Sequence, residues 1–349
     1  MTEPQKNNYT ALLQSVNQSE IHELLKKYKE TNKDSIKLSG NKSDLIKNLF
    51  DAIEGGIVTE IELQALIKDS EEYGDQYIFF FKPLNRTIVN RYNNGNTLVD
   101  SIIHPSVQQR FPKLRLTPTE FEWADFRFPN RGVANTWVMK MYDKKIKDIK
   151  TDDNFDPNTG KRTITYDRIE SRLIYIVEWN YLSQLEIKIS RTTFDSNKSL
   201  TAAVNLIRGK IYNNGNGIDT HAEATPLDLT NCINNILGGF EANDSIYKLL
   251  FVSFLDSEFG KASIRCFDDQ ESSDLFSEAS RKRAIEAYRD GDGKADGITV
   301  KFLADGSNGE LKSDVTVIIG KDSINKIIIP AKIKPQEYNY VRRKIAEFS

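Results

Sequence analysis

The chain has 349 residues, of which 39% are hydrophobic and 28% charged, and its formal net charge is −2. These values are ordinary for a globular protein and exclude a globally disordered chain. No apolar run is long enough to cross a bilayer and the first ten residues lack an apolar core, so we expect neither a membrane span nor a secretory signal. The near-neutral charge does not decide for or against a polyanionic partner, but short basic blocks at 140–150, 281–283 and 342–344 leave room for a phosphate-binding surface.

The two cysteines, Cys232 and Cys266, lie far apart in the sequence, and the three histidines are scattered. Isolated cysteines favour a reducing, cytoplasmic setting over a disulfide-bonded secreted one. They also do not supply the ligand spacing of a zinc site, and the sequence contains no nucleotide-binding loop or hydrolase elbow. We therefore predict no metal and no cofactor.

Residues 20–68 have the apolar spacing of three helices. Gly55 and Gly56 end the second of them, and Thr59, three residues before Glu62, has the pattern of a capping box that starts the third. A polar stretch follows at 70–75. We therefore predict a helical module over residues 1–75 and a body over residues 76–349.

The body begins with aromatic residues that predict a buried strand, YIFFFKPL. Further strands are predicted at 136–142, 172–179 and 185–190, and the Asp, Asn, Pro and Gly residues of DDNFDPNTGK predict a hairpin turn between the first two. Residues 85–130, with prolines at 105, 112, 118 and 129, have no pattern from which elements can be assigned.

The remainder of the body alternates helices and strands. We predict helices near 197–211, 226–237, 274–289 and 336–347, a second hairpin from KLLFVSFLD and KASIRCF, and strands ITVKFLA, DVTVIIG and KIIIPA. Strands that pair mostly with sequence neighbours indicate an α+β fold with antiparallel sheets. A division of the body into lobes 76–240 and 241–349 stays open.

The strongest local motif is SIKLSGNKSDLIKNL at residues 35–49. Gly40 permits a tight turn, and the following helix N-terminus, with Lys42, would present backbone N–H groups and positive charge to a phosphate. The segment resembles the second half of a SAP, or helix-extension-helix, DNA-binding motif. That resemblance implies DNA-backbone contacts at Lys37, Gly40, Lys42 and Lys47.

The order of elements is similar to that of the centromere protein N family: a helical module, an aromatic strand, a sheet domain with long hairpins and a smaller C-terminal sheet. In that family a basic groove between two domains grips the DNA backbone. The resemblance implies groove contacts by the lysines of one basic block, namely Lys140, Lys144, Lys145, Lys147 and Lys150. Such contacts are independent of base sequence and sensitive to salt.

Two alternatives come from other classes. Glu178, Glu186 and Lys188 are similar to the acid and E-x-K pattern of restriction-type nucleases, in which two carboxylates hold Mg²⁺ and the lysine helps to activate water. Strand alternation equally predicts these charges on a solvated face. The other alternative is a protein-interaction scaffold whose helical module docks a partner.

The favoured interpretation is non-catalytic DNA binding through phosphate-backbone contacts, with DNA as the principal partner and a protein partner left open. The abundance of Asn, Lys and Ile is compatible with an AT-rich bacterial genome, so a DNA-sensing role in antiviral defence is a further expectation. Enzymatic activity is not decided by these patterns.

Overall fold

The computed structural model describes residues 1–33, 35–114, 118–128, 135–191, 197–256, 260–266, 274–291, 293–320 and 325–349. Its strands are β1 (Gly74–Pro83), β2 (Glu122–Arg127), β3 (Trp137–Asp156), β4 (Lys161–Trp179), β5 (Leu185–Ser190), β6 (Ala224–Pro226), β7 (Tyr247–Asp256), β8 (Gly260–Arg265), β9 (Lys294–Phe302), β10 (Val315–Gly320) and β11 (Lys326–Lys332). Within the described residues they form one sheet, ordered β2-β3-β4-β5-β1-β11-β10-β9-β7-β8, with β6 paired to β1. All of its strand pairs are antiparallel, which confirms the predicted α+β class.

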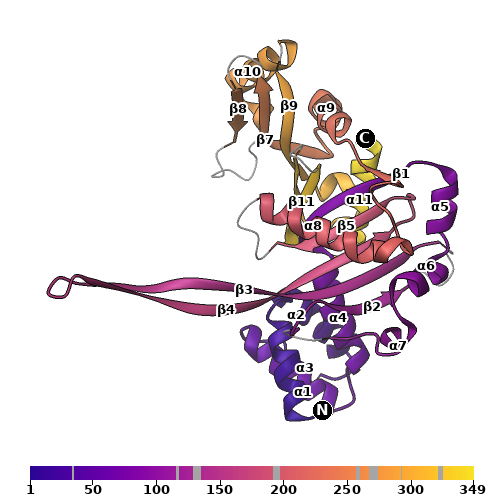
Figure 1. Ribbon diagram of the computed structural model, residues 1–349, viewed down its shortest axis with the longest axis vertical. Helices are drawn as coiled ribbons and strands as arrows, with labels where there is room; N and C mark the ends of the chain where they lie inside the picture. The colour runs from indigo at the N-terminus through magenta and orange to yellow at the C-terminus, as the bar shows by residue number, and fades with distance from the viewer. Residues whose placement is uncertain are drawn as a thin grey trace.

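Four helices build the N-terminal module: α1 (Glu3–Leu13), α2 (Gln18–Lys29), α3 (Lys42–Glu54) and α4 (Glu60–Glu72) (Figure 1). The last three are the predicted ones, whereas α1 was not expected from the sequence. The predicted capping box forms, because the Glu62 amide donates to Thr59 Oγ1 at 3.2 Å and the Thr59 amide donates to Glu62 Oε2 at 3.1 Å. Leu13, Ile21 and Leu49 are buried in a core that belongs to the module alone.

The other α-helices of the described body are α5 (Arg86–Tyr92), α6 (Gly95–Ile102), α7 (Pro105–Gln108), α8 (Asn197–Tyr212), α9 (Thr230–Gly238), α10 (Ala279–Asp290) and α11 (Pro335–Phe348). The first three and β2 occupy the segment in which no element was predicted. Asn85 and Asn94 cap α5 and α6 by accepting from backbone amides three residues later, at 3.0 and 3.4 Å. These asparagine caps were a usable signal that the prolines obscured.

Strand β1 lies at the centre of the sheet and is buried on both faces. Ile78 and Phe80 belong to a core formed mainly by the C-terminal strands and α9, α10 and α11. Phe79 and Phe81 point to the opposite side, into a core beneath α5, α6 and α8. The two proposed lobes therefore share one sheet, and the β1–β11 pairing is the seam between them.

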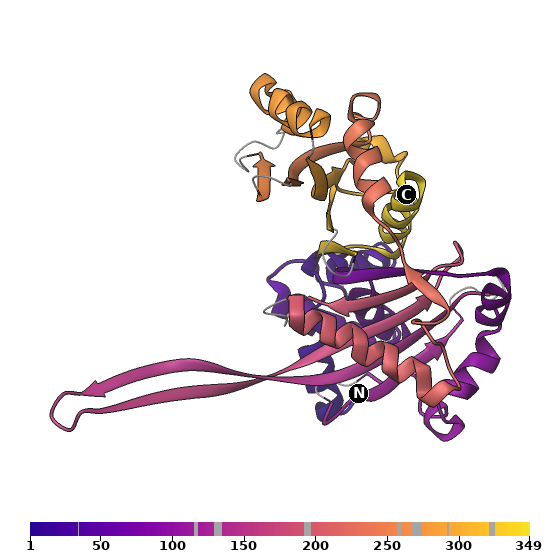
Figure 2. The same ribbon diagram turned by 45° about the horizontal axis from the view of Figure 1, so that its top comes forward.

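Helix α8 crosses one face of the strands β3, β4, β5 and β1 (Figure 2). The opposite face of the same strands carries charged residues, and α4 and α11 cover it. None of the helices in the described ranges is both long enough and apolar enough to cross a membrane.

The hairpin of β3 and β4 extends far beyond the sheet (Figure 1). Its strands have 20 and 19 residues and pair from Trp137 with Trp179 to Asp156 with Lys161. The pairing of β2 with β3 ends at Tyr142, and that of β5 with β4 ends at Tyr175. The hairpin turn was predicted correctly, but the strands were expected to end at 142 and begin at 172. Residues 145–171 form a projecting ribbon, here called the arm, about 40 Å long at the usual rise per residue.

Candidate functional site

The three residues of the nuclease alternative meet in space. Glu178 on β4 and Glu186 on β5 are direct partners in the sheet register. Lys188 Nζ lies 2.5 Å from Glu178 Oε2 and 3.8 Å from Glu186 Oε2. The eight-residue separation in sequence is therefore no obstacle, because Asn180 anchors a tight turn by accepting from the Leu182 amide at 2.8 Å.

Helix α11 covers this carboxylate cluster and supplies two of its partners. Arg342 Nη1 lies 2.8 Å from Glu178 Oε1 and 2.9 Å from Glu186 Oε1, and the Tyr338 hydroxyl donates to Glu186 Oε2 at 2.6 Å. Glu186 is 0% exposed and Lys188 1% exposed. Two carboxylates thus face two cations in a buried, charge-balanced cluster. A magnesium ion would have to displace one of those cations.

The electrostatics agree with a structural role for this cluster. Burial alone would raise the pKa of Glu178, but Lys188 and Arg342 outweigh it and hold the pKa at about 2, below its ordinary 4.5. The described residues also contain no group of three or more His, Cys, Asp or Glu side chains that would hold a metal ion. We therefore do not carry the nuclease alternative forward.

A second buried ionic cluster joins the helical module to the sheet. Lys140, one of the predicted nucleic-acid contacts, is 2% exposed, and its Nζ lies 2.5 Å from Glu71 Oε2 and 3.3 Å from Glu72 Oε1 on α4. Arg172 Nη2 lies 2.5 Å from Glu71 Oε1, and the Tyr142 hydroxyl donates to Glu71 Oε2 at 2.9 Å. Lys140 is therefore committed to an internal ion pair and is almost inaccessible to a nucleic-acid phosphate.

The SAP-like residues lie together around the start of α3. Lys37, Gly40 and Lys47 are exposed, and Gly40 has the positive φ of 119° that the tight turn requires. Lys42 instead donates to the Gln14 carbonyl at 2.6 Å, and partial burial lowers its pKa.

The N-terminus of α3 already holds a carboxylate. Asn41 is the N-cap, and its backbone amide donates to Asp44 Oδ2 at 2.9 Å. Because an acidic side chain occupies the first turn, a phosphate at this helix end would meet like charge.

The remaining predicted lysines lie on β3, at the base of the arm and along it. Lys144 Nζ is 2.5 Å from Glu170 Oε1 across the hairpin, and Lys150 forms an ion pair with Asp153. Lys145 is half-buried, and Lys147 is exposed. These lysines share an element with one another but not with the SAP-like residues, which belong to the module.

Charge is distributed unevenly over the chain. Residues 1–75 carry 9 lysines against 14 acidic residues, whereas residues 76–240 carry 22 basic against 17 acidic residues. The arm has six of each sign. The module with the SAP resemblance is thus acidic overall, and the positive excess lies on the sheet body outside the arm.

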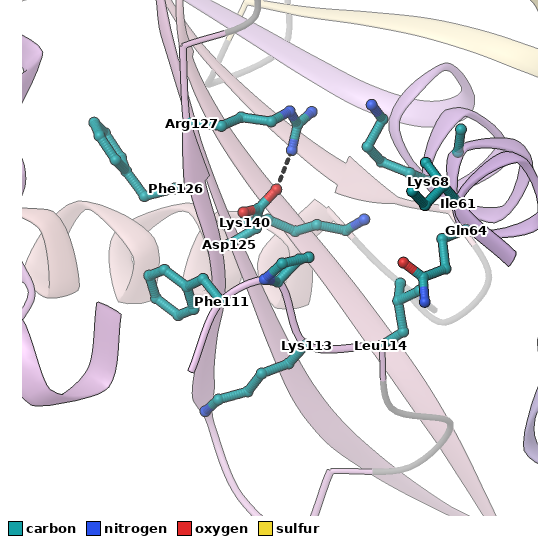
Figure 3. Close-up of a pocket in the computed structure, with 12 residues that line it drawn as sticks. Ile61, Gln64, Lys68, Phe111, Lys113, Leu114, Asp125, Phe126, Arg127 and Lys140 are labelled. Atoms are coloured by element: carbon teal, nitrogen blue, oxygen red, sulfur yellow. Dashed lines mark hydrogen bonds and ion pairs between the residues drawn. The ribbon is translucent and has the colours of Figure 1, made fainter. Parts of the chain in front are cut away.

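A cleft of about 400 Å³ separates α4 from the sheet edge at β2 (Figure 3). Ile61 and Gln64 line it from the helix, and Phe111 and Leu114 line it from the loop after α7. Its charged lining residues are already paired: Lys68 with Asp69, Lys113 with Glu122, Arg127 with Asp125, and Lys140 with Glu71. The cleft is therefore lined by apolar side chains and by charged side chains that are already in ion pairs.

The arm is the structural feature that the sequence patterns did not predict. Six of its large hydrophobic side chains are 39–63% exposed: Ile146, Ile149, Phe155, Ile164, Tyr166 and Ile169. A signal was present in the sequence. The predicted turn at 152–161 is separated from the predicted strands by nine residues on one side and ten on the other, and Ile, Thr or Tyr recur in both intervals.

Comparisons with known proteins leave identity open. No family model, no curated protein and no solved structure matches this chain. The resemblances to SAP modules and to centromere protein N therefore stay predictions.

Replacing the buried lysine of the junction should destabilise the fold strongly. Lys140→Ala removes the buried cation that Glu71 and Glu72 share. Arg172 still pairs with Glu71 and Arg127 with Glu72, so we expect the free energy of unfolding to fall by about 3 kcal/mol, the lower end for a broken buried pair. Lys144→Ala, which removes the partly exposed pair with Glu170, should cost less than about 1 kcal/mol. Urea unfolding of both variants measures the difference, and equal losses would contradict the structural role of Lys140.

The carboxylate cluster should set the acid stability of the protein. The pKa of Glu178 is depressed in the folded state, so its contribution is present above pH 4.5 and is lost as the pH falls toward 2. Arg342→Met removes one cause of the depression and should move the acid-unfolding midpoint to higher pH. Arg343→Met, at the exposed neighbour paired with Glu310, is the control. Circular dichroism against pH gives both midpoints, and coincident midpoints would refute the assignment.

Proposed function

We propose that this chain is a non-catalytic assembly protein that binds a protein partner through the arm. The observation that carries the proposal is the exposure of six large hydrophobic side chains on a ribbon that leaves the body. Large exposed apolar patches are rare on folded proteins, and those that occur commonly mark interaction sites.

The arm gains from being covered. An isolated two-stranded hairpin is marginally stable in water, and three or more strands or a packed layer are normally needed. In the β3–β4 register, Phe155, Ile164 and Tyr166 lie on the same face toward the tip, and Ile146 lies on that face nearer the body. Full burial of such a side chain is worth roughly 1.5–3 kcal/mol, so covering several half-exposed ones would stabilise a complex substantially.

Charge favours a protein over a polyanion as the arm's partner. The six basic and six acidic residues of the arm cancel. Several already pair within the ribbon, as Arg162 does with Asp153 at 2.5 Å and Arg168 with Asp148 at 3.2 Å. A neutral ribbon of mixed sign has no general attraction for phosphates, because the electrostatic part of nucleic-acid binding requires an excess of cations.

Loss of the arm should abolish partner binding without unfolding the body. In one variant Asn-Gly replaces residues 145–171, and in a second Phe155, Ile164 and Tyr166 are changed to Ser. We expect both to lose the proteins that co-purify with the tagged wild-type chain, at an unchanged melting temperature. Leu84→Ser, at an exposed body position, is the control and should keep them. Retention of every partner by both arm variants would refute the proposal.

A second candidate, DNA-backbone binding, is favoured by the basic excess of residues 76–240 and by the exposed Lys37 and Lys47. Phosphate contacts predict an affinity for mixed-sequence duplex DNA that falls steeply between about 50 and 200 mM salt. Lys37→Ala with Lys47→Ala should weaken binding and flatten that slope, while the variant without the arm should bind as the wild type does. Absence of binding at the lower salt concentration would remove this candidate.

A further inference from the structure

The outer edge of β3 is open along the arm. From Lys144 to Asp156 the strand pairs with β4 on one side, with one register shift between Lys150 and Asp152. Its pairing with β2 on the other side has ended at Tyr142. No other strand of the described residues lies along this edge. An open edge presents backbone N–H and C=O groups that are a template for pairing with another strand.

This edge is electrically polarised. The half nearer the body, residues 145–150, contains Lys145, Lys147 and Lys150 with one aspartate, a formal charge of +2. The half nearer the tip, residues 151–156, contains three aspartates and no basic residue, a formal charge of −3. A uniformly basic edge would repel a copy of itself, but a polarised edge is complementary to its own reverse.

We propose that the partner of the arm is a second copy of this chain, with the two β3 edges paired antiparallel around a two-fold axis. The axis lies near Thr151, so the basic half of each edge meets the acidic half of the other. A parallel arrangement would set like charge against like. The proposal rests on the proposed function in one respect, which is the choice of the arm as the contact surface.

The β4 edge fits this arrangement less well. Its tip half, residues 161–166, has a formal charge of +2, but residues 167–171 have only −1. The difference in formal charge between the two halves is therefore larger along β3 than along β4. The ion pairs within the ribbon do not prevent the exchange, because exposed pairs such as Arg162 with Asp153 contribute little to stability.

Pairing through β3 also meets the stability requirement of the ribbon. Two arms side by side make a four-stranded sheet, above the roughly three strands that independent stability requires. The second arm would also reduce the solvent exposure of the hydrophobic residues that β3 contributes, which are Ile146, Ile149 and Phe155. The interface is isologous, as expected for a closed dimer.

Charge reversal tests the pairing directly. One variant carries Lys145→Glu and Lys147→Glu, and the other carries Asp152→Lys and Asp153→Lys. Each then has like charge on both halves of the edge, so we expect the dimer dissociation constant of each to rise at least about tenfold. An equimolar mixture of the two restores opposite charges at both ends and should recover the wild-type dimer mass.

Sedimentation velocity and light scattering on the full chain over a concentration series measure the masses, with circular dichroism to confirm folding. A dimeric wild type, weakened single variants and a dimeric mixture support the proposal. A wild type that stays monomeric throughout, or a mixture as weak as its components, overturns it.

The variant lacking residues 145–171 separates this inference from the proposed function. It should be monomeric. If it dimerises like the wild type, the arm is not the dimer contact and the second-copy inference fails. If the wild type is monomeric but loses a different co-purifying protein, or duplex DNA, when the arm is removed, the arm is a contact surface and the second copy is the wrong partner.

Discussion

The fold depends on neutralising charges that lie on a buried face of the sheet. Strands β3, β4 and β5 place four charged residues on the side opposite α8, where none is more than 9% exposed: Lys140, Glu178, Glu186 and Lys188. A buried charge without a partner costs several kcal/mol, so this face must be covered by elements that bring opposite charges. Helix α4 brings the Glu71–Glu72 pair from the N-terminal module, and α11 brings an arginine from the end of the described chain.

This constraint explains why residues from the patterns that suggested chemistry form ion pairs within the fold. The two glutamates of the E-x-K pattern are direct partners in the sheet register. The groups that contact Glu186 from α11 are the guanidinium of Arg342 and the hydroxyl of Tyr338. Lys140, the first lysine of the expected groove, is an internal ion-pair partner of Glu71. Among the described elements, the arm is where large hydrophobic side chains stay exposed in the greatest number.

Local patterns predicted the parts of the structure that depend on local physics. The Thr59–Glu62 capping box, the DPNTG turn and the strands from 294 to 332 follow from hydrogen-bonding and periodicity within a few residues. The burial of Lys140 and Glu186 does not. Alternation along a strand distinguishes two faces, but it does not distinguish a face wetted by solvent from one covered by a helix distant in sequence. The length of the arm was obscured because strand prediction followed hydrophobicity, which falls where the ribbon leaves the body.

The central position of β1 has a consequence for how the chain folds during synthesis. Gly74 pairs with Lys332, and Gln76 pairs with both Ile329 and Ser190, so this early strand takes one neighbour from the middle of the chain and the other from near the end of the described sequence. Contacts between such distant residues form slowly, because a long loop must close before they stabilise anything. Until residues 326–332 have been made, Ile78 and Phe80 lack the core into which they pack. A nascent chain therefore carries an uncovered hydrophobic strand from the synthesis of β1 until β11 has been made. Such a state favours either a chaperone or a rapid final step of folding.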